Sequence, residues 1–170
     1  PIKPGTDLAL MLSMLQVIMS ENLYDRDFTL NHTVAPFLVR RDTCCFLRES
    51  DIFPGESKDN YVVWDQEKEE TVAVSPRTYS LSENTALFGK YNVKGIECAT
   101  ALHQLRGICN QYVPEKAEKI TGVSHVKIRR LAEDFATIKP ATIHLSSVMA
   151  RQQNSENTIM AGGTLVALTG

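Results

Sequence analysis

The sequence lacks a long hydrophobic run and a strong charge of either sign. Its longest apolar stretch, 8–19, is interrupted by Ser13 and Gln16, so no stretch reaches the roughly 18 apolar residues that a membrane-spanning helix needs. The formal net charge of the 170 residues is −2, which provides no basic field for binding nucleic acid. Hydrophobic residues make up 43% of the chain, which is enough for one domain with a buried core.

Motifs for nucleotide binding and nucleophilic catalysis are also missing. The sequence contains no Walker loop, no G-x-G-x-x-G pattern and no Ser-His-Asp order. Its histidines are scattered, none has a partner at metal-ligand spacing, and each is expected to be structural; they are His32, His103, His125 and His144. We therefore predict no catalytic residue and no metal ligand in this chain.

Four cysteines are present, and none are spaced as C-x-x-C. Cys44 and Cys45 are adjacent, whereas the paired ligands of a structural zinc or cluster site usually have about two to four residues between them. Cys98 and Cys109 fall on one predicted helix and would lie about 16 Å apart along its axis, too far to share a site. All four are expected to be buried free thiols.

The clearest local signal is in residues 1–20. A short Pro/Gly segment leads to Gly5, Thr6 and Asp7, and an almost wholly apolar helix is predicted over 8–20. Thr6 or Asp7 can cap this helix, because either side chain can accept an amide hydrogen of the first turn. Gly5 permits a tight turn and close approach of a ligand, and a helix N-terminus favours a polar or anionic group. The stretch is either an ordinary capped helix or a place that holds the polar edge of a ligand.

Three ordered segments resemble one enzyme family. Residues 1–28 read PIKPGTDLALMLSMLQVIMSENLYDRDF and resemble the pattern PxRPGTDxALxxxxxxxIxxExLYDxxF. Residues 112–141 read YVPEKAEKITGVSHVKIRRLAEDFATIKPA and resemble YTPExAxxITGVxxxxIRxLAxxFAxAKPA, and the ALTG of 167–170 matches a segment usually followed by Asn-x-Gly. These patterns are similar to those of the molybdopterin oxidoreductases, the dimethyl-sulfoxide-reductase family, which carry molybdenum on a bis(molybdopterin guanine dinucleotide) cofactor.

The resemblance implies that Gly5, Thr6 and Asp7 contact the guanine dinucleotide part of one pterin. The chemistry of Asp7 suits this role, since a carboxylate can accept the two edge N–H groups of guanine as a bidentate pair. Thr6 could then serve as the cap. Lys3 stands where the family often has Arg, and its ammonium could still meet a phosphate although it lacks the planar fork of a guanidinium.

A second candidate stretch follows a predicted buried strand at 141–145. Ligands of doubly wound sheets bind beyond the carboxyl ends of the strands, and related proteins often have Gly-x-Gly-x-Gln-Arg near the molybdenum at this turn. This sequence has SSVMAR at 146–151, so both glycines and the Gln are replaced while Arg151 remains. Arg151 is a candidate cofactor-binding residue; the alternative is a surface arginine.

The order of elements predicts an α/β fold that is part of a doubly wound, Rossmann-like domain, rich in helices and carrying an inserted β-hairpin. We expect one partial cofactor-binding domain over 1–170, with the insert at 35–75 and strands near 61–64 and 71–74. Cys44 and Cys45 stand where one branch of the family commonly has Gly-Lys or similar. Helices are predicted over 97–110, 115–120, 124–137 and 158–169.

By resemblance, the chain is a fragment of a molybdenum-dependent oxidoreductase whose parent performs two-electron redox by oxygen-atom or hydride-equivalent transfer. The fragment alone is expected to be inactive. Implied partners are the remainder of the parent chain and an iron–sulfur electron-transfer subunit, with a 4Fe-4S cluster upstream of this segment. Two alternatives remain open: a stand-alone guanine-nucleotide-binding domain, and a structural or interaction domain with Tyr61 and Trp64 exposed as docking residues. The compartment and the substrate are left open.

Overall fold

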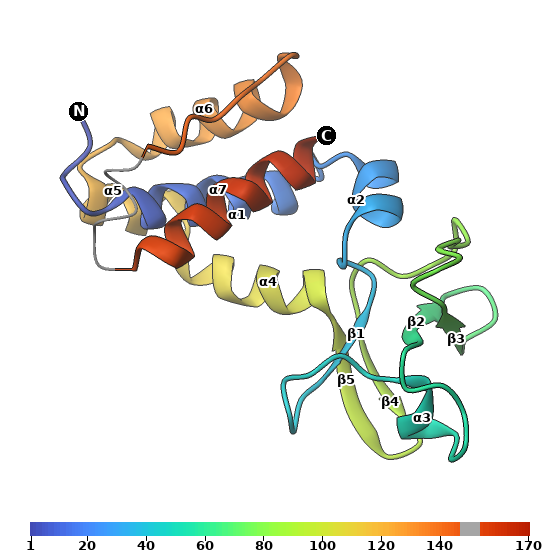
Figure 1. Cartoon of the computed structure of the whole chain (residues 1–170). Helices are drawn as coiled ribbons and strands as arrows, with labels where there is room; N and C mark the ends of the chain where they lie inside the picture. Colours follow the sequence, from blue (N-terminus) through green and yellow to red (C-terminus); the bar gives the residue numbers. More distant parts are fainter. Residues whose placement is uncertain (147–153) are drawn as a thin grey trace. The chain divides into compact units, whose positions relative to one another are not determined.

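The computed structural model describes residues 1–146 and 154–170 (Figure 1). The contacts of the chain divide it into two compact units. Pro1–Phe28 and Arg106–Gly170 form the first, here called the helical unit, and Thr29–Leu105 form the second, here called the β unit. The assignment of 1–170 to one cofactor-binding domain stays a prediction.

Helix α1 (Asp7–Ser20) is the centre of the helical unit. It packs against α5 (Pro114–Thr121), α6 (His125–Thr137) and α7 (Ser155–Thr169), as Figure 1 shows. Because neighbours surround it, α1 is apolar on nearly every face, and Leu15, Val17 and Ile18 are completely buried. The predicted opening helix is therefore confirmed.

The short helices of this unit end and begin at the residues that the sequence indicates. Pro114 opens α5, and Gly122 ends it in the left-handed conformation with φ of 78°. Ser124 precedes α6, although its side chain makes no capping bond. The α6 N-terminus is instead closed by Glu118, whose carboxylate accepts from the His125 amide at 3.1 Å and contacts its ring nitrogen at 2.6 Å.

The β unit holds two antiparallel sheets. One has the strand order β1 (Leu38–Arg40), β5 (Ile96–Thr100), β4 (Lys90–Val93), and the other pairs β2 (Tyr61–Asp65) with β3 (Glu70–Val74). The predicted hairpin at 61–74 is thus confirmed. Further elements of the described chain are α2 (Arg26–His32), α3 (Glu49–Ile52), α4 (Ala101–Cys109) and the 3-10 turn η1 (Asn110–Tyr112).

Aromatic stacking fills the two cores of the β unit. Trp64 stacks on Tyr91 with ring centroids 4.5 Å apart, and Phe37 stacks on Tyr61 at 4.6 Å. In one core, Val63 and Val74 pack beside Phe37 and Tyr61. In the other, aliphatic residues pack beside Trp64 and Tyr91; they are Leu38, Leu47, Ile52, Val62, Val93 and Ile96. Tyr61 and Trp64 are half-buried and serve these cores, so they do not form the exposed docking pair that an interaction domain would present.

Two predicted elements differ from the structure. Residues 141–145 form no strand, because an extended segment needs a neighbouring strand to satisfy its backbone and no described residue pairs with it. The helix predicted over 97–110 starts only at Ala101, because Glu97–Thr100 belong to β5 and pair with both β1 and β4. Cys98 and Cys109 therefore lie on different elements.

The mixed helix and sheet content confirms the α/β class, with helices predominating and an antiparallel β region inserted between them. In the described ranges, 1–146 and 154–170, no helix combines the length and apolar character needed to cross a bilayer.

Candidate functional site

The site begins with a tight turn over Lys3–Thr6. The Thr6 amide donates to the Lys3 carbonyl at 3.3 Å, and Gly5 between them has a φ of 77°. Pro at the second position and Gly at the third, with positive φ, are the requirements of a type II turn. Gly5 is exposed and carries no side chain, so the backbone here is open to close approach.

Lys3 anchors this turn to the C-terminal end of α5. Its amide donates to the Thr121 carbonyl at 2.9 Å, and its ammonium donates to the Lys119 carbonyl at 3.4 Å. The stem of Lys3 passes over Gly122, where a Cβ would come within 3.4 Å of the Lys3 Cε atom. The cation thus lies at the negative end of a helix dipole, and one of its three donors is engaged.

Thr6 is the residue before α1, but its hydroxyl does not cap the helix. It donates backward to the Lys3 carbonyl at 2.7 Å and closes the turn instead. The Thr6 carbonyl accepts from the amides of Ala9 and Leu10 at 3.1 and 3.3 Å. The expected side-chain cap by Thr6 is therefore wrong, because the turn before the helix competes for the same hydroxyl.

Several polar groups at the first turn of α1 have no hydrogen-bond partner among the described residues. In the described part of the chain, no group hydrogen-bonds the Asp7 carboxylate or the backbone amides of Gly5, Asp7 and Leu8. These amides carry the positive end of the dipole of a 14-residue helix. A carboxylate acceptor beside several amide donors can bind a planar edge that both donates and accepts hydrogen bonds.

Arg151, the other predicted site residue, lies outside the described residues. Among the described residues that flank it in sequence, Leu145 lies close to Gly162 of α7. A Cβ on Gly162 would lie 2.7 Å from a methyl carbon of Leu145. This contact explains the first of the two adjacent glycines in α7 as a close approach. Gly163 faces open space, so packing does not explain the second.

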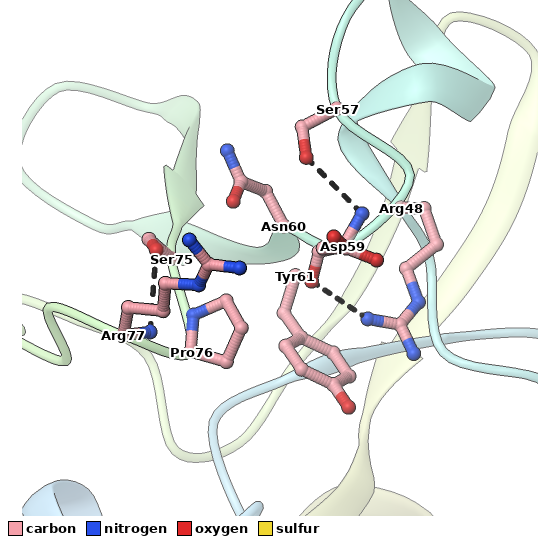
Figure 2. A pocket seen from close by; sticks show the side chains of 8 residues that line it. All are labelled: Arg48, Ser57, Asp59, Asn60, Tyr61, Ser75, Pro76 and Arg77. Atoms are coloured by element: carbon pink, nitrogen blue, oxygen red, sulfur yellow. Dashed lines mark hydrogen bonds between the residues drawn. The ribbon is translucent and has the colours of Figure 1, made fainter.

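A separate polar pocket of about 400 Å³ lies in the β unit (Figure 2). Arg48 lies over the Tyr61 ring at 3.7 Å and donates to the Asp59 carbonyl at 3.0 Å. The Ser57 and Ser75 hydroxyls accept from the backbone amides of Asp59 and Arg77. Figure 2 shows these three bonds, which engage the side chains of Arg48, Ser57 and Ser75 in the local loop structure. Of the residues singled out from the sequence, Tyr61 lines this pocket, whereas the candidate cofactor-binding residues Lys3, Gly5, Thr6 and Asp7 do not.

Comparison with known proteins gives relatives over the whole chain. The alpha subunit of perchlorate reductase from Dechloromonas aromatica is 34% identical over 99% of this chain. The alpha subunit of dimethylsulfide dehydrogenase from Rhodovulum sulfidophilum is also 34% identical, and a putative dimethyl sulfoxide reductase catalytic chain from Halobacterium salinarum is 32% identical, each over 100% of it. No protein-family model matches the chain.

The chain belongs to the molybdopterin oxidoreductases. It spans 22%, 20% and 20% of the lengths of these three relatives, or about a fifth. A solved structure, acetylene hydratase from Pelobacter acetylenicus, shares the fold with a TM-score of 0.56 at 23% identity, over 100% of this chain and 14% of that one. The family that the sequence patterns indicated is thereby confirmed.

The cysteines of this molybdopterin oxidoreductase segment depart from expectation. Cys98 and Cys109 are buried as predicted, but Cys44 and Cys45 are exposed. Burial raises the pKa of the Cys98 thiol, and it raises that of Cys109 to about 12. Adjacent cysteines in a short polar stretch beside arginines were the sequence signal for exposure, and the prediction of four buried thiols overlooked it.

Proposed function

We propose that this chain forms part of the binding site for the guanine dinucleotide end of a molybdopterin cofactor, within a longer molybdenum-dependent oxidoreductase. The observation that carries the proposal is the open edge formed by the Asp7 carboxylate and the amides of Gly5, Asp7 and Leu8. The family membership supports it, since the relatives are named reductases and dehydrogenases.

Each residue of the turn has a role that fits its contacts. Asp7 would accept the N–H groups of the guanine edge, and a free amide of the first turn would donate to its carbonyl oxygen. Gly5 would let the backbone lie against the nucleotide without a Cβ. Lys3 would direct its remaining donors to a phosphate, and Thr6 would fix the turn through its bond to Lys3. Arg151 stays a proposed cofactor contact on the grounds of resemblance alone.

The chemistry of the parent would come from molybdenum and its pterins, which exchange an oxygen atom or a hydride equivalent for two electrons. The residues of this segment would bind and orient the cofactor and would take no part in bond making. The segment alone is therefore expected to be inactive. A 4Fe-4S cluster elsewhere in the parent and an iron–sulfur partner subunit complete the proposal.

The proposal is tested in the full-length enzyme by the substitution Asp7→Asn. An amide cannot accept both guanine N–H groups, so loss of a charge-assisted pair should weaken cofactor retention about ten- to a hundredfold. The readout is the guanine nucleotide released on acid denaturation after dialysis. Asp134→Asn on α6 is the matched control, since its side chain is 48% exposed and its ion pair with Arg130, at 3.6 Å, lies at the surface. Unchanged guanine content in Asp7→Asn would overturn the role of Asp7.

A stand-alone nucleotide-binding domain is the second candidate, because the same open edge could hold a free guanine nucleotide. It requires the 170-residue chain to bind GDP or GMP in calorimetry, and absence of heat at millimolar ligand would exclude it. The Asp7→Asn result in the full-length enzyme is independent of this outcome.

A further inference from the structure

Cys44 and Cys45 lie side by side in the chain, both exposed, at a turn of the β unit. Together they line an open pocket of about 580 Å³. Phe46, Arg40 and Arg48 also line it, and the Phe46 ring packs edge-on against the rings of Phe37 and Tyr61. Two accessible thiols one peptide bond apart, beside an aromatic ring, form a chemical group that the cofactor role does not use.

Backbone bonds hold the two cysteines in place. The Arg40 amide donates to the Cys45 carbonyl at 2.8 Å, and the Cys44 amide donates to the Arg40 carbonyl at 3.1 Å. The side chain of Asp42 accepts two bonds from the Arg40 guanidinium, at 2.7 and 3.0 Å, and one from the Thr43 amide at 2.8 Å. The turn is therefore closed at its base and braced inside, so the thiols are presented from an ordered backbone.

The backbone at Cys44 is in the left-handed region, with φ of 55°. A non-glycine residue is strained there, because its Cβ crowds the following carbonyl oxygen. Glycine would remove that strain, so the position carries a thiol at the expense of local stability. Strained backbone with a reactive side chain is a feature from which function can be inferred.

We propose that Cys44 and Cys45 form a dithiol site for trivalent arsenic, in particular for an aryl arsenical whose ring can lie against Phe46. In the binding step the two thiol sulfurs attack the arsenic of an arsine oxide. Two As–S bonds form, the As=O bond breaks, and both thiol protons leave with the oxygen as water. Arsenic stays trivalent, so no oxidant or reductant is needed.

The geometry favours a bridging atom over the alternatives. The Cys44–Cys45 peptide is trans, so the two Cα atoms lie about 3.8 Å apart, which is closer than an unstrained disulfide allows. A bridging arsenic lengthens the link between the sulfurs and relieves that restriction. Zinc is disfavoured, since it needs three or four protein ligands and no group of three His, Cys, Asp or Glu side chains in the described ranges could hold a metal.

The test titrates the reduced 170-residue chain with phenylarsine oxide, using a phosphine reductant that contributes no thiol. We expect one equivalent to bind, to be displaced by ethanedithiol and to resist a monothiol at equal concentration. Tandem binding raises affinity through effective concentration, so Cys45→Ser should weaken binding about 10²- to 10⁴-fold. Mass mapping of the adduct should place it on the peptide that holds both cysteines.

Cys44→Gly separates binding from folding. Glycine adopts positive φ without strain. This variant should therefore unfold at a denaturant concentration equal to or above that of the parent chain, and its binding of the arsenical should still be weakened. Cys98→Ala removes a buried thiol and should bind as tightly as the parent chain. Binding that falls less than tenfold in both Cys44→Gly and Cys45→Ser, or an adduct mapped to Cys98 or Cys109, would overturn the proposal.

Discussion

The two units differ in the residues that they place in left-handed backbone. Among the described residues, the helical unit uses Asn22 and Asn154 at positive φ, apart from glycine. Asn is enriched there because its short side chain can bond locally. The β unit uses Cys44, Glu69 and Lys94, which have no such compensation. The helical unit thus follows local preference, whereas the turns of the β unit are imposed by other contacts.

Strand pairing provides those contacts. Val93 pairs with Ile96 in the β4–β5 hairpin, so Lys94 and Gly95 form a two-residue turn, and their φ values of 48° and 88° fit a type I′ turn. The Lys94 ammonium donates to the Ile52 carbonyl at 3.0 Å. A residue poorly suited to the turn is therefore held by partners far along the chain.

Core truncation should give the largest effect and should separate the two units. Leu15 of α1 and Leu47 of the β unit are both fully buried, so Leu15→Ala and Leu47→Ala should each lower the free energy of unfolding by about 2–5 kcal/mol. Urea denaturation measures the loss, and hydrogen exchange locates it. Leu15→Ala should speed exchange mainly in α1 and its helical neighbours, and Leu47→Ala mainly in the strands.

Val126→Ala is the control for both truncations. Val126 lies in α6 and is 64% exposed, so its truncation should change stability by no more than about 0.5 kcal/mol. Equal acceleration of exchange throughout the chain in Leu15→Ala would contradict the division into two units.

The fold was predictable from sequence where the signals were local. Continuous apolar residues predicted α1, Pro114 and Gly122 bounded α5, and branched and aromatic residues marked β2. The strand β5 was missed because its Ile96–Thr100 residues run directly into α4 without a breaker. Its turn also lacks an Asn-Gly or Asp-Gly signal, so only the pairing with β1 and β4 identifies it.

The candidate site was predictable in outline but not in its bonds. The Pro-Gly turn and the helix start were evident at Gly5, Thr6 and Asp7. The Thr6 hydroxyl bonds the Lys3 carbonyl three residues earlier, a local alternative to the cap that the sequence pattern does not distinguish. The docking of Lys3 on the end of α5 depends on a segment more than a hundred residues away. Such long-range contacts cannot be predicted from the neighbouring residues in the sequence.

A glycine substitution tests whether the turns of the β unit carry a backbone cost. Glu69 is exposed, has a φ of 53° and precedes β3, so Glu69→Gly should raise the free energy of unfolding by about 1 kcal/mol as the strain is removed. Asn22→Gly in the helical unit is the matched control and should change it by only a few tenths, since Asn already tolerates this region. Denaturant midpoints compare them, and equal gains would remove the contrast between the units.

Adjacent glycines in α7 offer a smaller test within the helical unit. Gly163 faces open space, so Gly163→Ala should stabilise the helix by up to about 0.8–1 kcal/mol. Gly162→Ala should gain nothing or lose stability, because its Cβ would lie 2.7 Å from a methyl carbon of Leu145. Thermal unfolding of the two variants measures the difference. An equal gain in both would show that Leu145 moves aside without cost.

We expect the smallest change in the free energy of unfolding when the pH is lowered, through Asp42 in the turn that holds Cys44 and Cys45. Hydrogen bonds from Arg40 lower the pKa of Asp42 from 3.8 to about 2. A carboxylate with a depressed pKa stabilises the folded chain above its ordinary pKa, and this stabilisation is lost as pH falls from 3.8 towards 2. The Asp42 side chain is exposed, so the change in stability should be small. Asp42→Asn removes the titrating group, and the stability difference between the two chains should shrink across this window. A carboxyl NMR titration that gave Asp42 an ordinary pKa would show that the brace of this turn does not form in solution.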